Sequence, residues 1–247
     1  MPTAIVNGLQ HYYEDEGTGK TLVLLHGATG SAHQFEEHIP ALSQNYRVIV
    51  PDMRSMGRSA HVKELTPVSA WVEDVGGLLD HLGVEQAHIM GTSLGSRVGM
   101  RFELEQPERV SSLTVDAPIV AISPGANKNL NQRTGNPDDA PPALKETYQR
   151  QHGDDWRDVV LNYFNIRNNP ALQEYFNLRD LIPQIQAPML VLHGDADDVI
   201  HPLADAYELK ERVPKARLAI VPGLAYSVNR FGHERFSELV LEFLNSL

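Results

Sequence analysis

A serine flanked by small residues is the strongest chemical signal in the chain. Residues 91–95 read GTSLG, an apolar run at 88–90 precedes them, and a helical pattern begins near Ser96. A serine on a tight turn between a buried strand and a helix forms a nucleophile elbow, because the turn exposes the hydroxyl at the sheet edge and glycine lets the backbone make it. The pattern predicts Ser93 as a nucleophile.

Short apolar runs predict the strands that position this serine. Runs bounded by turn residues are typical of strands buried on both faces, and they occur at 22–25, 48–50, 87–90 and 189–192. Asn7-Gly8 separates two strand-like runs near the start of the chain, and this dipeptide favours a two-residue hairpin turn. We expect an N-terminal hairpin followed by a buried sheet.

Helical patterns separate the predicted strands. Apolar residues recur at 71, 75, 78, 79 and 82, which places them on one face of a helix, and a similar stripe runs through 236–247. Strands and helices that alternate with short connections predict a mostly parallel sheet flanked by helices on both faces, an α/β fold.

One long segment breaks this alternation. Residues 118–183 contain no strand pattern, and they hold candidate helices at 143–151 and 156–164. Structureless loops of this length are uncommon unless they close over a site. We therefore expect a helical lid at 118–183, inserted after the sixth strand into a core of 1–117 and 184–247. Its aromatic residues are expected to set substrate selectivity.

Nearly the whole chain outside this lid resembles the α/β-hydrolase superfamily, in its compact group of esterases, lactonases and carbon–carbon hydrolases. The resemblance is carried by GTSLG, by HGA at 26–28, and by DMRSMGRS at 52–59, where Ser55 replaces a usual glycine. It implies an α/β-hydrolase fold, and a structural role for His26 and for loop 52–59. It also implies an oxyanion hole formed by the backbone N–H groups of Ala28 and Leu94.

The same resemblance implies a catalytic acid. The letters HGDAD at 193–197 are similar to the family pattern H-G-x-x-D, which makes Asp197 the expected acid that orients a base. Asp116 is the alternative, since some relatives carry the acid after the preceding strand. We interpret the remaining polar residues nearby as a solvated acidic loop, because their spacing fits no standard metal site; they are His193, Asp195, Asp198 and His201.

The catalytic base is where the chain departs from the family. Tyr226 occupies the position that the pattern G-x-x-H gives to histidine. A phenol with an ordinary pKa of about 10 is a poor acceptor for a serine proton at neutral pH. Three explanations stay open. Tyr226 is a single substitution, natural or introduced; His233 supplies the base; or the protein does no hydrolysis and binds a ligand, signals, or uses Tyr226 as the acid of a lyase or cyclase.

The predicted function is therefore a serine hydrolase with a catalytic set of Ser93, Asp197 and Tyr226. It would act on a small carboxylic ester, lactone or related carbonyl compound through an acyl-enzyme, and Tyr226 would impair it. On this hypothesis Tyr226→His raises activity by orders of magnitude. The resemblance implies no cofactor and no metal.

Composition excludes several other classes. The chain has 247 residues, 42% of them hydrophobic, and its 21 basic against 32 acidic side chains give a net charge of −11. This charge disfavours nucleic acid and anionic membranes as partners and leaves a small-molecule substrate. No cysteine is present, so disulfides and thiolate chemistry are excluded. We find no signal-peptide or membrane-span pattern and expect a cytoplasmic protein.

Overall fold

The computed structural model describes residues 2–134 and 136–247. For residues 132–134 it describes the backbone and not the side chains. The strands are β1 (Thr3–Val6), β2 (Leu9–Glu16), β3 (Thr21–Leu25), β4 (Arg47–Pro51), β5 (Ala87–Thr92), β6 (Val110–Asp116), β7 (Met189–Gly194) and β8 (Ala216–Val221). The α-helices are α1 (Ile39–Leu42), α2 (Ala70–His81), α3 (Leu94–Glu105), α4 (Pro124–Thr134), α5 (Pro142–His152), α6 (Trp156–Arg167), α7 (Pro170–Tyr175), α8 (Leu203–Arg212), α9 (Val228–Phe231) and α10 (His233–Leu244). Short 3₁₀ turns are η1 (Ala32–Phe35), η2 (Pro107–Arg109), η3 (Pro137–Asp139) and η4 (Ile182–Gln184). None of these described helices is both long and apolar enough to cross a membrane.

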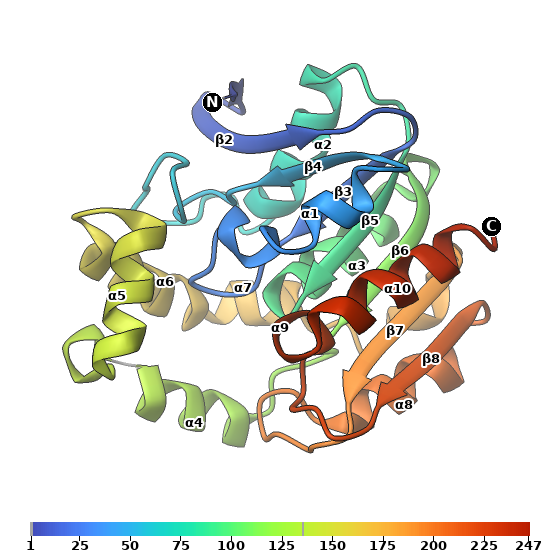
Figure 1. Ribbon diagram of the computed structural model, residues 1–247. Coiled ribbons are helices and arrows are strands. Elements are labelled where there is room, and N and C mark those ends of the chain that lie inside the picture. The colour runs from blue at the N-terminus through green and yellow to red at the C-terminus, as the bar shows by residue number, and fades with distance from the viewer. Residues whose placement is uncertain (1, 135) are drawn as a thin grey trace.

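The eight strands form one sheet in the order β1-β2-β4-β3-β5-β6-β7-β8 (Figure 1). Strands β3 to β8 pair in parallel, whereas β1 and β2 form an antiparallel hairpin at the edge. Asn7 and Gly8 turn this hairpin with φ values of 50° and 78°, which is why the turn needs residues that tolerate positive φ. The predicted mostly parallel α/β sheet and its opening hairpin are confirmed.

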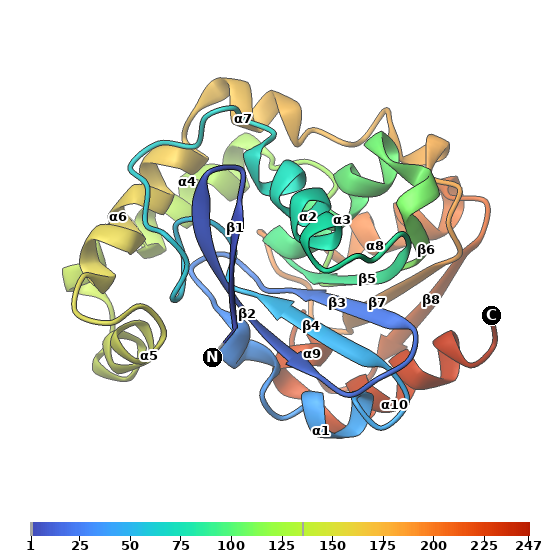
Figure 2. The same ribbon diagram turned by 90° about the horizontal axis from the view of Figure 1, so that it is seen from above.

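Helices cover both faces of the sheet (Figure 2). On one face α2, α3 and α8 bury side chains such as Trp71 and Phe102, and on the other η1, α1 and α10 bury Phe35, Leu42 and Phe236. Burial of each such large apolar side chain contributes roughly 1.5–3 kcal/mol to the free energy of folding. The two packed faces hold the parallel strands rigid, so that the loops at their carboxyl ends keep fixed positions.

The described part of the segment between β6 and β7 contains α4 to α7, the turns η3 and η4 and the loops that connect them, and no strand. Helices α4, α5 and α6 lie beyond the carboxyl ends of the central strands (Figure 1). Tyr148, Trp156 and Phe164 give this segment a small core of its own. The ring of His152 ties α5 to the main body, because its Nε2 lies 3.0 Å from the carbonyl oxygen of Thr29 and its Nδ1 accepts the N–H of Gly57 at 2.9 Å. Its role as a lid stays a prediction.

Candidate active site

Ser93 lies on the turn between β5 and α3, where the sequence predicts an elbow. Its backbone angles, φ 53° and ψ −110°, are strained for a residue with a side chain. The flanking glycines permit this turn: a Cβ on Gly91 would lie 2.1 Å from the carbonyl oxygen of Gly95, and one on Gly95 would lie 2.1 Å from that of Leu25. The strand, the strained residue and the helix therefore fix the hydroxyl of Ser93 at the carboxyl edge of the sheet.

Ser93 opens into a cavity of about 600 Å³. Loops of the sheet form one side of this cavity, and residues of α4, α5 and α6 form the other, including Leu130, Tyr148 and Tyr163. A volume of this size suits a small organic molecule.

Two backbone N–H groups beside Ser93 are available to a ligand. Ala28 and Leu94 both line the cavity, and neither N–H has a hydrogen-bond acceptor within the described chain. Their neighbours differ, since the N–H of Gly27 donates to Oε1 of Gln34 at 2.9 Å and that of Ser93 donates to the carbonyl oxygen of Asp116 at 3.0 Å. Unpaired N–H groups at this position can stabilise a negatively charged oxygen.

A histidine that the sequence analysis assigned to a solvated loop contacts the serine directly. Nε2 of His201 lies 2.9 Å from Oγ of Ser93, and only 7% of His201 is exposed. The prediction of a solvated position is therefore wrong for His201. Burial lowers the pKa of the imidazole, although Asp198 acts in the opposite direction. The ring is consequently neutral near pH 7 and can accept a proton.

Asp198 supports this histidine from the other side. Its Oδ1 lies 3.4 Å from Nδ1 of His201, and it also accepts the backbone N–H groups of Ile200 at 2.9 Å and His201 at 3.1 Å. The hydrogen bond with His201 is the largest of the effects that hold the pKa of Asp198 well below its ordinary value. An ionised Asp198 favours a proton on Nδ1, which leaves Nε2 free to accept the hydroxyl proton of Ser93.

Asp197, the acid expected from the family pattern, lies elsewhere. Its side chain is exposed, and its Oδ1 accepts the N–H of Leu203 at 2.9 Å, at the first turn of α8. It is absent from the cavity lining described here, whereas Asp198 is part of it. The structure thus corrects the expected pairing: Asp197 caps a helix, and the next residue along the chain contacts the histidine.

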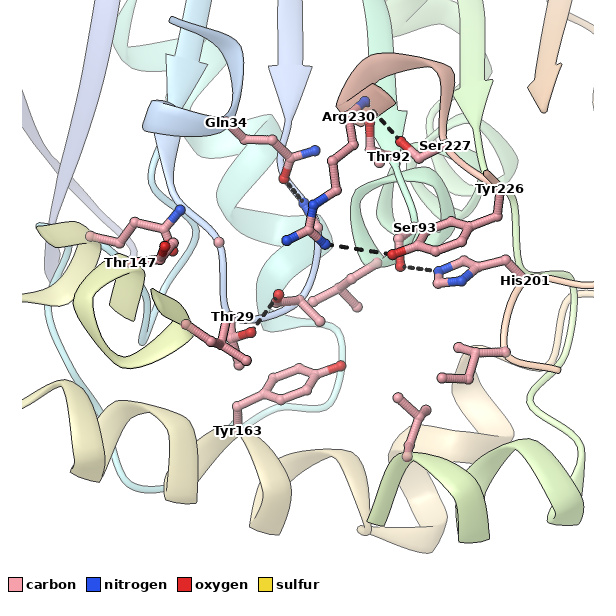
Figure 3. Close-up of a pocket in the computed structure, with 18 of the residues that line it drawn as sticks. Thr29, Gln34, Thr92, Ser93, Thr147, Tyr163, His201, Tyr226, Ser227 and Arg230 are labelled. Atoms are coloured by element: carbon pink, nitrogen blue, oxygen red, sulfur yellow. Dashed lines mark hydrogen bonds between the residues drawn. The ribbon is translucent and has the colours of Figure 1, made fainter. Parts of the chain in front are cut away.

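Tyr226 is a neighbour of the histidine. Its ring stacks on that of His201 with the centroids 4.2 Å apart and the planes 3° from parallel. Its hydroxyl lies 3.5 Å from Nη1 of Arg230. Figure 3 shows Ser93, His201 and Tyr226 converging at one end of the cavity, with the side chain of Arg230 extending toward them.

The alternative acid and the alternative base occupy other positions. Asp116 is fully buried, and it accepts the hydroxyl of Ser227 at 2.6 Å and the N–H of Val228 at 2.8 Å. Burial raises its pKa to about 7 against the effect of these hydrogen bonds. His233 begins α10 and pairs with Glu37 at 3.2 Å. Asp116 therefore anchors the loop after Tyr226, and His233 lies at the rim of the cavity without a described hydrogen bond to Ser93.

One topological signal could have pointed to His201. The loops after parallel strands all open at the carboxyl edge of the sheet, where ligands bind in open α/β folds. His201 lies seven residues after the end of β7, in such a loop. The family pattern places the base in the loop after β8, and the sequence therefore pointed to position 226 and to His233 instead.

Comparisons with known proteins agree with this architecture. The α/β hydrolase fold family matches residues 20–227. A 2-hydroxy-6-oxononadienedioate/2-hydroxy-6-oxononatrienedioate hydrolase of Burkholderia vietnamiensis is 29% identical over 268 residues, covering 96% of this chain and 91% of that protein. A protein named "Putative carbamate hydrolase RutD" from Caulobacter sp. (strain K31) is 28% identical over 266 residues, covering 99% and 98%.

Solved structures show the same fold. A meta-cleavage product hydrolase from Pseudomonas fluorescens IP01 has a TM-score of 0.82 at 23% identity, with 100% of this chain and 98% of that chain covered. A thermophilic esterase from Thermogutta terrifontis has a TM-score of 0.82 at 21% identity, with 99% and 98% covered. Since the family match spans most of the sequence and the strand order, elbow and cavity accord with it, the chain belongs to the α/β hydrolase fold family.

Proposed function

We propose that the protein is a serine hydrolase in which Ser93 is the nucleophile, His201 the general base and Asp198 the acid that orients it. The observation that carries this proposal is the 2.9 Å contact between Nε2 of His201 and Oγ of Ser93. A base within hydrogen-bond distance of a nucleophile, itself held by a third group, is the arrangement that activates a hydroxyl. Compared with the family pattern, the base comes from the loop after β7 instead of the loop after β8.

The acylation step follows from these contacts. Oγ of Ser93 forms a bond to the substrate carbonyl carbon while its proton passes to Nε2 of His201. The carbonyl electron pair moves onto the oxygen, where the N–H groups of Ala28 and Leu94 stabilise it. When the carbonyl reforms, the leaving group departs and takes the proton from His201.

Water completes the reaction by the same route. His201 accepts a proton from water, whose oxygen attacks the acyl carbon and displaces Ser93. The serine regains its proton and a carboxylic acid is released. Asp198 stabilises the positive charge that His201 carries transiently in both steps, and its bonds to two backbone N–H groups help to hold it in place.

Tyr226 acts on the base in this scheme. Its stacked ring restricts rotation of the imidazole, so that Nε2 stays directed at Ser93. The rival hypothesis, a protein of this fold without hydrolysis, rested on the missing histidine at position 226. His201 supplies a candidate base and removes the reason for preferring that rival.

The proposed substrate is a small carboxylic ester, lactone or related carbonyl compound. The cavity volume of about 600 Å³ limits its size. Among the relatives, one is named for hydrolysis of an oxo-dienedioate and another is named a putative carbamate hydrolase, and both names support a carbonyl compound as the substrate.

The experiment measures turnover of short-chain 4-nitrophenyl esters and small lactones by the parent protein, by Ser93→Ala and by His201→Gln. We expect measurable hydrolysis by the parent. Loss of the base in subtilisin costs roughly 10⁶ in kcat, and we expect a loss of at least roughly 10³ for either variant here. Parental activity in His201→Gln would contradict the assignment of the base, and activity in Ser93→Ala would contradict that of the nucleophile.

A further inference from the structure

We infer that the substrate carries a carboxylate close to the carbonyl that reacts, and that Arg230 binds this group. The inference rests on the proposed function and adds a substrate class to it. The starting observation is the distribution of charge. The chain as a whole has a net charge of −11, yet the described cavity lining contains three arginines, Arg97, Arg150 and Arg230, against one acidic residue, Asp198.

These three arginines differ from most others in the protein. Each arginine of a larger set is ion-paired with a carboxylate; the set is Arg47, Arg54, Arg58, Arg101, Arg109, Arg157, Arg179, Arg212 and Arg235. Within the described part of the chain, no ion pair is formed by the three arginines of the cavity. In a protein with an excess of carboxylates, three of the five described arginines without an ion pair therefore line the cavity, and the other two are Arg167 and Arg217.

Arg97 sets the field at the inner end of the cavity. It is 6% exposed, one of its terminal nitrogens donates to the carbonyl oxygen of Phe176 at 2.8 Å, and its Nε has no hydrogen-bond partner among the described residues. Burial lowers the pKa of this guanidinium to about 10, so it stays charged at neutral pH. A buried charge without a carboxylate partner is costly, and an anion in the cavity would offset that cost.

Arg230 is placed to contact the anion itself. Its Nη1 lies 3.5 Å from the hydroxyl of Tyr226, whose ring is stacked on the base, and its side chain extends toward Ser93 (Figure 3). The guanidinium is exposed to the cavity, and the phenol is its one described side-chain partner. A guanidinium presents a planar fork of donors that matches a carboxylate. The remaining donors of Arg230 are therefore available to a ligand next to the catalytic groups.

The other charged groups of the lining do not cancel this attraction. Asp198 is engaged with His201 and with two backbone N–H groups. His33 and His233 at the rim pair with Glu36 and Glu37 respectively. The excess positive charge thus lies inside the cavity, where a small anion fits, whereas the net charge of −11 disfavours a large polyanion.

The test compares two esters of equal length that differ in charge, 4-nitrophenyl hydrogen succinate and 4-nitrophenyl methyl succinate. We expect the parent to prefer the anionic ester. Arg230→Gln should lower kcat/KM for the anionic ester roughly tenfold to a hundredfold, the range for a hydrogen bond to a charged group, and change the neutral ester less than about threefold. The control is Arg235→Gln, an exposed arginine on α10 outside the described cavity lining, which should change neither.

A carboxylate on the leaving group is tested in the same way with 4-(butyryloxy)benzoate and its methyl ester. Dependence on Arg230 in either pair supports the inference and identifies the half of the substrate that carries the charge. Equal turnover of charged and neutral esters, unaffected by Arg230→Gln in both pairs, overturns it and leaves the proposed hydrolase intact.

A binding measurement separates the two proposals. Succinate and the neutral succinamide are titrated calorimetrically into Ser93→Ala, with and without Arg230→Gln. Preferential binding of succinate that weakens at least about tenfold without Arg230 supports the anion site even if no ester is turned over, in which case the hydrolase proposal alone fails. No preference for succinate contradicts the anion site.

Discussion

Two adjacent aspartates allow a matched test of the acid. Asp198→Asn keeps an oxygen that can accept the N–H groups of Ile200 and His201 but removes the charge beside Nδ1 of His201. Asp197→Asn likewise keeps an acceptor for the N–H of Leu203, and it lies on the exposed side of the same loop. The two substitutions are chemically identical and one residue apart, so they differ only in proximity to the base.

The expected loss follows from the distance. For unit charges 3.4 Å apart, Coulomb's law gives about 1 kcal/mol in water and about 5 kcal/mol at an effective dielectric constant of about 20. The Asp198 side chain is 22% exposed, so its environment lies between these limits. A loss of about 2–3 kcal/mol of transition-state stabilisation corresponds to a decrease of roughly 10²-fold in kcat/KM. Asp197→Asn should stay within about threefold of the parent.

The pH profile provides a second measurement. His201 must be neutral to accept a proton, and burial lowers its pKa below the ordinary 6.5, so kcat/KM of the parent should reach its plateau below neutral pH. Asp198 raises the pKa of His201, so its removal should move the acidic limb to lower pH. A greater loss in Asp197→Asn than in Asp198→Asn, or an acidic limb of Asp198→Asn that moves to higher pH, would refute the role of Asp198.

Three further outcomes are expected. In ester hydrolysis assays, Tyr226→Phe should keep the parental kcat and pH profile because it keeps the stacked ring, and Tyr226→Ala should lower kcat roughly tenfold. Tyr226→His should not raise kcat by orders of magnitude, since His201 already contacts Ser93. A large gain in Tyr226→His would contradict the assignment of His201 as the base. Asp116 has a raised pKa of about 7, so its contribution to the free energy of unfolding is present at acid pH and is lost as pH rises from about 4 to 7, by roughly 1.4 kcal/mol per pH unit at most. In urea titrations at several pH values, Asp116→Asn should reduce this dependence of the unfolding free energy on pH. An unchanged pH dependence would refute the assignment of the effect to Asp116. Tyr163→Ala should shift selectivity between short and long acyl esters roughly tenfold with little change in Tm, whereas a lower Tm with unchanged selectivity would count against a lid function.

The sequence predicted the scaffold well because the scaffold depends on local patterns. The run at 22–25, the turn at Asn7-Gly8 and the stripe from Trp71 to Leu82 each determine an element on their own, and the structure contains all three. The position of Ser93 followed for the same reason, since flanking glycines are required where a Cβ would collide with a carbonyl oxygen.

The side chains that contact Ser93 and His201 could not be predicted in the same way. Whether Asp197 or Asp198 reaches the histidine depends on the path of one loop, which a residue count does not determine. In the structure Asp197 binds the N-terminus of α8, and this contact leaves its neighbour directed at His201. The contact between His201 and Ser93 joins residues 108 positions apart, and only the assembled sheet edge brings them together. The family pattern points to position 226, and the ring at that position stacks on His201.

The central claim is that His201 activates Ser93, and the most direct measurement is the rate at which a fluorophosphonate probe labels the serine. Mass spectrometry of the labelled peptide identifies the residue, and no substrate needs to be known. We predict that the parent is labelled at Ser93, that His201→Gln is labelled at least roughly 10³-fold more slowly, and that His233→Ala is labelled at the parental rate. Labelling of His201→Gln at the parental rate, or loss of labelling in His233→Ala alone, would contradict the account.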